Sequence, residues 1–196
     1  MKAILMSIKP KWCEKIFSGE KTVEVRKVAP KIEPPFKVYV YESLGKKFSC
    51  SRCEGCPIRF PLGCNEGAGA VVGEFVCDKV EENIPDYHPV YEEFFYSVFE
   101  YGNDCLSSKE IQKYGKGDTL YGLHITAPKW YDTPKELSEF VSCKYYKDEE
   151  CLLSNKTHCK YRVPDLNPDG SVNIFECRKR VTRPPQSWMY VEEIEE

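Results

Sequence analysis

Two hydrophobic periods follow each other in the first 42 residues of the chain. The apolar side chains of Trp12, Ile16 and Phe17 recur at helical spacing, and Gly19 is typical of the left-handed residue that ends a helix. Beyond this glycine the period falls to two, which is the spacing of a strand. The pattern predicts a strand, a helix and two further strands in turn, at residues 1–7, 10–18, 22–28 and 37–42.

The remainder of the chain mixes strand and helix patterns in irregular order. Ser107 and Ser108 precede a helical stretch as a cap would, and Thr133 with Pro134 marks the start of another helix. Aromatic residues within 90–99 recur at helical spacing, which favours a packed core. The predicted strands and helices lie at residues 68–80, 107–114, 120–127, from 133 onward, and 187–192. Because no regular βαβ rhythm or repeat occurs, the pattern indicates an α+β or barrel-like fold.

Length and composition are those of one globular domain. The chain has 196 residues, of which 41% are hydrophobic, so a single domain over residues 1–196 has enough apolar material for a core. Two stretches without a hydrophobic period, 44–66 and 142–182, interrupt it as cysteine-rich insertions. No apolar stretch approaches the roughly 20 residues of a membrane span, and we expect no signal peptide at the N-terminus. We therefore expect a soluble, cytoplasmic protein without a membrane partner, whose oligomeric state the sequence leaves open.

Charge is distributed unevenly along the chain. The net charge is −3, which disfavours non-specific binding to DNA. Residues 1–47 nevertheless contain ten lysines and one arginine against five glutamates, a net charge of +6, while the remainder carries −9. A basic N-terminal part beside an acidic remainder allows a local site for an anion.

The main polar feature of this basic part is the stretch that follows the predicted helix. In a strand, Val23 and Val25 share one face. Glu24 and Arg26 then share the other face, with Lys21 at the strand entrance. Three such side chains can converge on one polar ligand through charge-assisted hydrogen bonds. The alternative is an ordinary strand face on which these charges are solvated.

Three short motifs near the N-terminus resemble the signature of the ASCH domain family. They are Ser7-Ile8-Lys9-Pro10, Lys15-Ile16 and the Gly-x-Lys-x-x-Glu-x-Arg string of residues 19–26. Two later stretches, Tyr121–Ile125 and Arg183–Val191, resemble the middle and the end of short ASCH proteins from phages and prophages. The resemblance implies an α+β fold of the PUA-like superfamily. This fold is a β-barrel with short flanking helices, to which this chain would add its cysteine-rich insertions.

PUA-like barrels recognise RNA or modified bases, so the resemblance implies an RNA-binding or nucleotide-binding protein. Its ligand cleft would be formed by Lys21, Glu24 and Arg26, with Lys9 and His124 as further ligand-binding residues. The cations would bind phosphate or carbonyl oxygens, and Glu24 would accept a hydrogen bond from an exocyclic amine. The expected partner is therefore RNA or a nucleotide-like small molecule.

Two other functions stay open on the same resemblance. Small bacterial ASCH proteins are amidohydrolases of N4-acetylcytidine; Lys21 matches their catalytic lysine, whereas Glu24 stands where they have a threonine. In this alternative Lys21 and Glu24 are the catalytic residues, with the lysine as acid or base and Glu24 positioning water. The second alternative is a phage accessory protein that binds another protein through its cysteine-rich lobes.

The first insertion has the cysteine spacing of a closed metal site. Its cysteines are Cys50, Cys53, Cys56 and Cys64. Four thiolates complete the tetrahedral shell of a structural zinc ion, Zn²⁺. An iron–sulfur cluster is the alternative cofactor, and a flexible insertion with unligated thiols is the alternative to both. The eleven cysteines of an intracellular chain argue against a disulfide framework.

The second insertion contains a looser set of metal-ligating residue types. We take Cys143, Cys151 and Cys159 as its ligands, with His158 and Cys177 nearby. An inserted loop without a core needs a staple, so a second zinc ion is expected here, or one ion shared by both insertions. The cofactor expectation is therefore one or two structural zinc ions. The remaining cysteines, expected to be buried thiols, are Cys13, Cys77 and Cys105.

Overall fold

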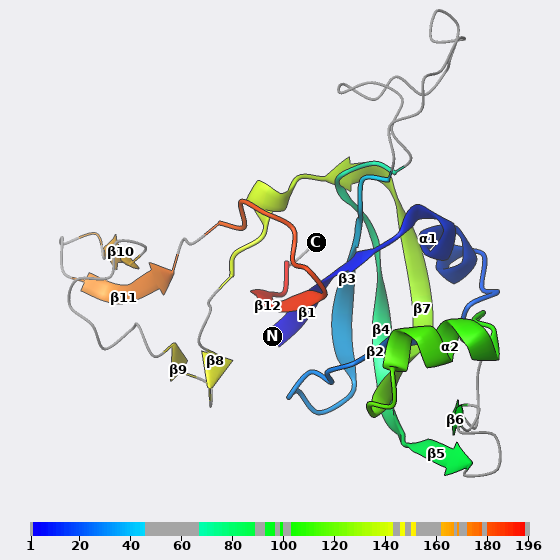
Figure 1. Ribbon diagram of the computed structural model, residues 1–196. Helices are drawn as coiled ribbons and strands as arrows, with labels where there is room; N and C mark the ends of the chain where they lie inside the picture. Colours follow the sequence, from blue (N-terminus) through cyan, green and yellow to red (C-terminus); the bar gives the residue numbers. More distant parts are fainter. Residues whose placement is uncertain are drawn as a thin grey trace, which may run out of the picture.

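The computed structural model describes residues 2–45, 67–88, 93–96, 99, 103–142, 146–147, 150–151, 162–166, 168, 172–177 and 180–194. Within these ranges the helices are α1 (Pro10–Phe17), α2 (Ser108–Gly115) and the 3-10 helix η1 (Leu137–Glu139). The strands are β1 (Lys2–Ile8), β2 (Val23–Arg26), β3 (Phe36–Glu42), β4 (Val71–Asn83), β5 (Pro85–His88), β6 (Glu93–Tyr96), β7 (Leu120–Lys135), β8 (Tyr146–Lys147), β9 (Glu150–Cys151), β10 (Arg162–Leu166), β11 (Val172–Cys177) and β12 (Trp188–Glu192). Figure 1 shows their arrangement.

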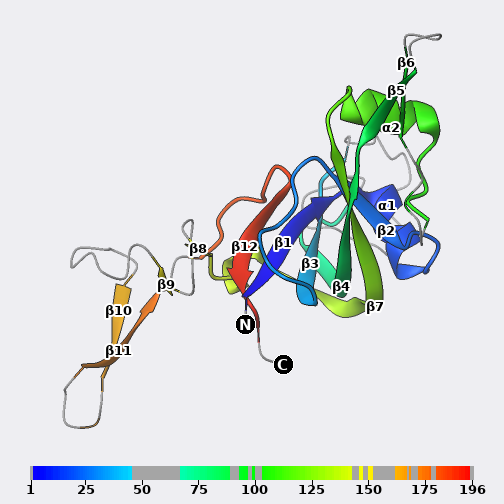
Figure 2. The same ribbon diagram turned by 90° about the horizontal axis from the view of Figure 1, so that it is seen from below.

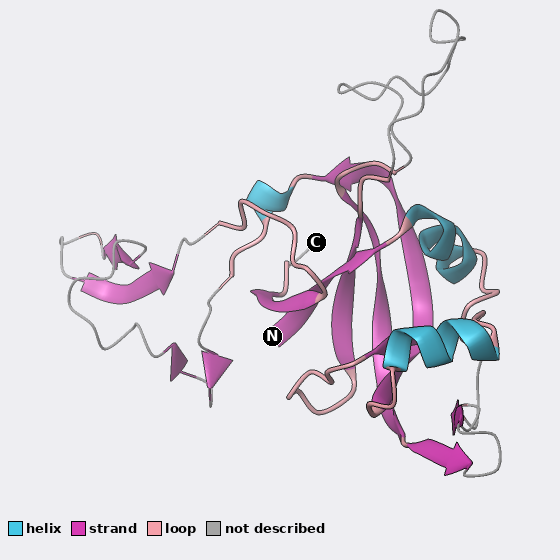
Figure 3. Cartoon of the chain, in the orientation of Figure 1, coloured by secondary structure: helices cyan, strands magenta, loops and turns pink. Residues whose placement is uncertain are grey.

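Six of these strands form one mixed sheet in the order β12-β1-β3-β4-β7-β2. Strands β1 and β3 run parallel, and the other neighbouring pairs are antiparallel. The long strands β4 and β7 pair with several register shifts, which bend the sheet. Helix α1 packs against β7 and β3. The result is the expected α+β class (Figure 3).

The sheet is open, which corrects the β-barrel that the resemblance implied. Among the described strands, β2 and β12 lie at the two edges and each pairs on one side only. Strand β2 ends after four residues, and side chains bridge the gap that a barrel would close with strand pairing. Arg26 Nη2 donates to the carbonyl of Ser7 at 2.8 Å, and Trp188 Nε1 donates to the carbonyl of Val28 at 2.9 Å.

Both faces of the sheet are buried. On one face, Val38 of β3 packs with Cys13 and Ile16 of α1. On the opposite face, Tyr39 packs with Phe140, which follows η1, at a ring-centroid distance of 4.9 Å. Alternate residues of β3 therefore enter two different cores, and this explains why its polar–apolar alternation is weak.

A third cluster lies beneath α2, at the end of the sheet formed by β2 and β7. It contains Val23, Val25, Phe99 and Leu120. The ring of Phe99 lies over Gly122, where an added Cβ would come within 2.7 Å of the ring atoms. A side chain at Gly122 would therefore displace Phe99 from this cluster.

The structure confirms α1, α2 and the principal predicted strands, and it differs from the prediction in two places. Thr133 and Pro134 continue β7 instead of opening a helix, because this strand remains paired with β4 as far as Lys135, opposite Val71. The pairing overrides the local cap signal, and the helix is reduced to the three residues of η1. Residues 93–96, with aromatics at helical spacing, form the strand β6.

The predicted insertions lie partly outside the described residues. Residues 46–66 of the first insertion are not described. Within the second, the short strands β8 to β11 form two separate two-stranded ribbons, which lie beyond β12 in Figures 1 and 2. Among the residues that the structure describes, no helix has the length and apolar character to cross a membrane.

Candidate functional site

A cleft opens where the two edges of the sheet approach each other. It has a volume of about 780 Å³ and lies between β2, the end of β1, the start of α1, helix α2 and the loop before β12. Its charged lining residues in the described part of the chain are Lys9, Lys11, Lys21, Glu24, Arg26 and Glu110. Four of the five residues that the sequence assigns to a ligand cleft are therefore part of its wall.

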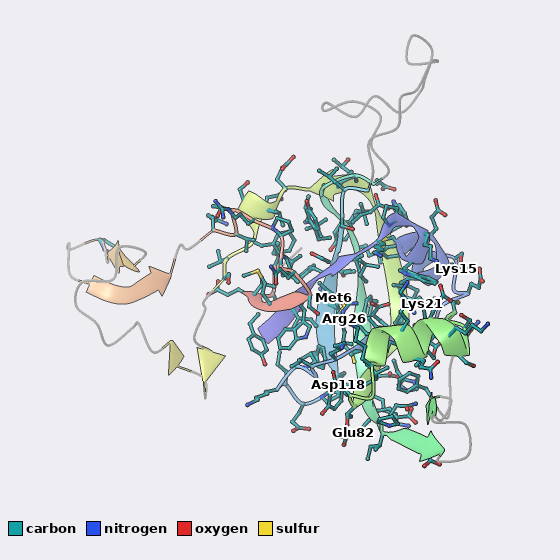
Figure 4. The ribbon with its side chains drawn as sticks, viewed as in Figure 1. Met6, Lys15, Lys21, Arg26, Glu82 and Asp118 are labelled. Atoms are coloured by element: carbon teal, nitrogen blue, oxygen red, sulfur yellow. The ribbon has the colours of Figure 1, made fainter. Side chains whose placement is uncertain are left out.

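Lys21, Glu24 and Arg26 form a continuous charged chain in the wall of this cleft. Lys21 Nζ lies 3.4 Å from Glu24 Oε2, and Arg26 Nη1 lies 2.7 Å from Glu24 Oε1. Their side chains are 2%, 5% and 13% exposed, in sequence order. Figure 4 labels the two cations, with Lys21 beside α2 and Arg26 toward β1. The carboxylate of Glu24 thus holds two cations in place at once.

The pairing of β2 explains why these charges are buried. Glu24 lies directly opposite Leu123 of β7, so the two side chains share one face of the sheet. Leu123 belongs to the core cluster beneath α1. Val23 and Val25 occupy the other face, which α2 covers. Both faces of β2 are therefore covered, and the charges of Glu24 and Arg26 are largely buried in the wall of the cleft.

The loop at 103–106 supports Lys21 and was not predicted as part of the site. The main chain of Asn103 accepts a hydrogen bond from Thr22 N at 2.8 Å, and Asn103 N donates to Thr22 Oγ1 at 2.8 Å. Lys21 Nζ donates to the carbonyl of Asp104. The side chains of Asn103 and Asp104 accept from the amides two residues on, a turn chemistry that these residue types favour. This turn signal was the one clue to the loop in the sequence.

Aromatic side chains form part of the cleft wall. Lys11 Nζ lies 3.9 Å and Lys21 Nζ 5.2 Å from the centre of the Trp12 ring, both within the range of a cation–π contact. Tyr41 and Tyr114 also line the cleft. Trp12 packs only partly against the core, so one ring contributes both to folding and to the wall of the site.

The mouth of the cleft is more polar and more exposed than its interior. Lys11 Nζ lies 3.8 Å from Glu110 Oε1, with side chains 56% and 49% exposed. Hydrogen bonds from the main chain and the hydroxyl of Ser107 lower the pKa of Glu110 below its usual value, which keeps this carboxylate charged. Lys9, at the start of α1, is exposed. Together the described lining residues carry four cations against two carboxylates.

His124 is the one predicted ligand-binding residue that lies outside the cleft. It is opposite Val23 in the sheet and therefore on the face that Glu24 does not share. Its Nε2 lies 2.8 Å from Glu81 Oε2. The two-residue period of β7 predicts which residues share a face with His124. The sequence did not show that this face is the one of Val23, and not the one of Glu24.

Buried ionisable groups also occur outside the lining of the cleft. Glu42 is 8% exposed and accepts a hydrogen bond from Ala68 N at 2.6 Å. Burial raises the pKa of this carboxyl above its ordinary value, and the hydrogen bond from Ala68 offsets part of the increase. Burial also raises the pKa of the Cys13 thiol, and it raises that of Cys77 to about 12. Both are the buried thiols expected, whereas Cys105 is partly exposed.

The metal-site predictions fall on residues that the structure does not describe. Cys50, Cys53, Cys56, Cys64, Cys143 and Cys159 lie outside the described residues, and only the backbone of Cys151 is described, in β9. Among the described side chains, no group of three or more His, Cys, Asp or Glu could hold a metal ion. The zinc prediction therefore stays a prediction.

Comparison with known proteins gives a likeness in structure without a match in sequence. No protein-family model matches the chain, and no curated protein matches it. The crystal structure of ASCH from Zymomonas mobilis has 18% sequence identity and a TM-score of 0.44, covering 69% of this chain and 73% of that chain. Two single-substitution variants of that protein match at 17% and 18% identity, with TM-scores of 0.43 and 0.42. They cover 70% and 69% of this chain and 77% and 74% of theirs. At this sequence identity and TM-score, the likeness assigns no residue role and no activity to this chain.

Proposed function

We propose that this chain is an RNA-binding or nucleotide-binding protein of the ASCH, PUA-like type, and that its ligand binds in the cleft beside Lys21, Glu24 and Arg26. The observation that carries the proposal is the buried charged chain in the wall of an open cleft. An internal ion pair contributes little to stability compared with apolar residues of similar volume. Two cations and one carboxylate, ordered beside an accessible cavity, are therefore better explained by recognition of a polar ligand.

The donors and acceptors of this chain suit a nucleobase or a phosphate. Lys21 has three N–H donors; one is directed to the Asp104 carbonyl and one to Glu24. Arg26 Nε is buried without a hydrogen-bond partner among the described residues. Each oxygen of the Glu24 carboxylate contacts one cation and retains a lone pair that can accept from an exocyclic amine. Carbonyl, phosphate and amine groups of a nucleotide match these positions.

The aromatic side chains provide the second element of nucleotide recognition. Trp12, Tyr41 and Tyr114 line the same cleft as the charged chain. Stacking of a base on an aromatic ring contributes about 1–3 kcal/mol, with little dependence on the base. Polar groups would then supply the selectivity among bases that stacking lacks.

Replacement of Trp12 tests this proposal. We expect single nucleotides or short single-stranded RNA to bind the wild-type protein in isothermal titration calorimetry, and Trp12→Leu to weaken binding by about 1–3 kcal/mol. Trp130→Leu is the matched control, because Trp130 is 47% exposed and lies outside the cleft. Equal loss in both variants would contradict binding in the cleft. Absence of any binding by the folded wild type would favour the protein-interaction alternative, in which the cysteine-rich insertions bind another protein.

Hydrolysis of a modified nucleoside such as N4-acetylcytidine is the second candidate function. It is favoured by the separation of 3.4 Å between the Lys21 ammonium and the Glu24 carboxylate within one cleft. In such a pair the carboxylate can position water and the lysine can transfer a proton. Thr22 does not line the cleft, and its hydroxyl accepts from Asn103 N, so it does not replace the missing threonine nucleophile.

We further propose structural zinc in the insertions. The support is the spacing of Cys50, Cys53, Cys56 and Cys64, which provides four thiolates for one tetrahedral ion. Elemental analysis of protein purified under reducing conditions should give about one zinc per chain, or two if the second insertion also binds. Protein without stoichiometric metal would contradict this proposal. Visible charge-transfer absorption would indicate an iron–sulfur cluster in place of zinc.

A further inference from the structure

The cations of the cleft are arranged in two tiers. Lys21 and Arg26 lie in the buried wall, with side chains 2% and 13% exposed, and Glu24 neutralises one of these two charges. Lys9 and Lys11 lie at the exposed mouth. The two tiers belong to consecutive segments, because α1 begins next to Lys9 and β2 follows this helix. A ligand that fills the cleft therefore meets positive charge at both ends.

The contacts of the outer tier are weak and easily exchanged. The carbonyl of Lys9 accepts hydrogen bonds from Trp12 N and Cys13 N, but its exposed side chain has no hydrogen bond or ion pair with any residue that the structure describes. Lys11 contacts the Trp12 ring at 3.9 Å and Glu110 at 3.8 Å, with both partners of the ion pair about half exposed. Exposed pairs of this kind contribute little to stability, so Lys11 can leave both partners at small cost.

Lys11 also lies over the aromatic surface on which a base would stack. Its ammonium is closer to the centre of the Trp12 ring than that of Lys21, at 3.9 Å against 5.2 Å. A base stacked on that surface would displace Lys11, and the released ammonium would need a new anionic partner. A phosphate attached to the same base supplies this partner, and lysine binds phosphate well as a compact point charge.

Resting on the proposed function, we propose that the ligand is phosphorylated, and that Lys9 and Lys11 form a phosphate subsite at the mouth of the cleft. The base stacks on Trp12 and meets Lys21, Glu24 and Arg26 in the interior. The phosphate enters between the two lysines as Lys11 moves away from Trp12 and Glu110. A free nucleotide and one phosphodiester of an RNA chain both supply this chemistry.

The test compares ligands that differ only in the phosphate. Cytidine, cytidine 5′-monophosphate, inorganic phosphate and a short single-stranded RNA are titrated into the wild-type protein at low salt. We expect the monophosphate to bind about tenfold more tightly than cytidine, which corresponds to about 1.4 kcal/mol. In a Lys9→Ala/Lys11→Ala variant, the two ligands should bind alike. The matched control is Lys31→Ala/Lys135→Ala, which removes the same charge outside the cleft and should keep the tenfold difference.

Salt dependence distinguishes the two sources of phosphate. If two lysines hold the RNA, the binding constant should fall as the salt concentration rises. A plot of the logarithm of the binding constant against the logarithm of the salt concentration should have a slope of about −1.4. A much steeper slope would contradict a compact subsite and indicate an extended basic surface. Equal binding of cytidine and its monophosphate would refute the subsite and leave the cleft intact. If the Lys31→Ala/Lys135→Ala control also binds cytidine and its monophosphate alike, the phosphate subsite is refuted as well. If no nucleoside, nucleotide or RNA binds, the proposed function fails together with this inference.

Discussion

Glu24 is the residue whose loss should most affect the folded state of this cleft. Glu24→Ala removes the carboxylate that lies 3.4 Å from Lys21 Nζ and 2.7 Å from Arg26 Nη1. Both cations then stay buried without a counter-ion. Breaking a buried pair in this way costs about 3–5 kcal/mol. Lys21 keeps its hydrogen bond to the Asp104 carbonyl and Arg26 keeps its bond to Ser7, so we expect about 3 kcal/mol, the lower end of this range.

Urea unfolding, followed by circular dichroism, measures this loss. With a slope of about 1–3 kcal/mol per molar urea, the midpoint of Glu24→Ala should fall by about 1–3 M. Glu20→Ala is the matched control, because Glu20 pairs with Lys15 at the surface, where water screens the pair. Glu24→Gln should lie between wild type and Glu24→Ala, since its amide oxygen still accepts a hydrogen bond. If Glu24→Ala and Glu20→Ala lose the same stability, the charged chain is not the buried unit described above.

Two further predictions concern Glu42 and the chemistry of Lys21. Burial raises the folded-state pKa of Glu42 above 4.5, so the free energy of unfolding should fall as pH rises from 4.5 through the raised pKa. Glu42→Gln lacks this penalty and should gain stability relative to wild type over that window; an advantage that does not change with pH would contradict the assignment. N4-acetylcytidine should show little or no hydrolysis, because the stretch at residues 19–26 resembles that of the amidohydrolases except that Glu24 replaces their threonine. Substantial turnover that disappears in Lys21→Ala would instead establish a hydrolase.

Local signals in the sequence predicted the helices and strands well where the apolar face or the cap of a single element determined its structure. The helical spacing of Trp12, Ile16 and Phe17 gave α1, and Ser107 gave the start of α2, where it forms a capping box with Glu110. These local signals failed where pairing between distant strands determined the secondary structure. Thr133 and Pro134 carry the signal of a helix start, yet pairing with β4 keeps them in β7.

The same distinction holds for the candidate site. The shared face of Glu24 and Arg26 was predictable, because it depends only on the period of one strand. Lys21 precedes that strand, and its side chain is held by the carbonyl of Asp104. The burial of Glu24 and Arg26 depends on what covers that strand, namely α1 on the Glu24 face and α2 on the other. The loop at 103–106, about 80 residues from Lys21 in sequence, has no signal that would link it to the site. Its position follows from the tertiary fold alone.

The most direct test of the central claim is nucleotide binding by Lys21→Met. Methionine keeps the length of the side chain, and Glu24 retains Arg26 at 2.7 Å, so the fold should persist and show a cooperative unfolding transition. Hydrogen bonds to a charged group contribute about 1.5–3 kcal/mol, so isothermal titration calorimetry should show a loss of affinity of at least about tenfold. Lys15→Met, which changes a partly exposed lysine outside the cleft, should bind as the wild type does. Wild-type affinity in the folded Lys21→Met variant would contradict ligand binding at the charged chain.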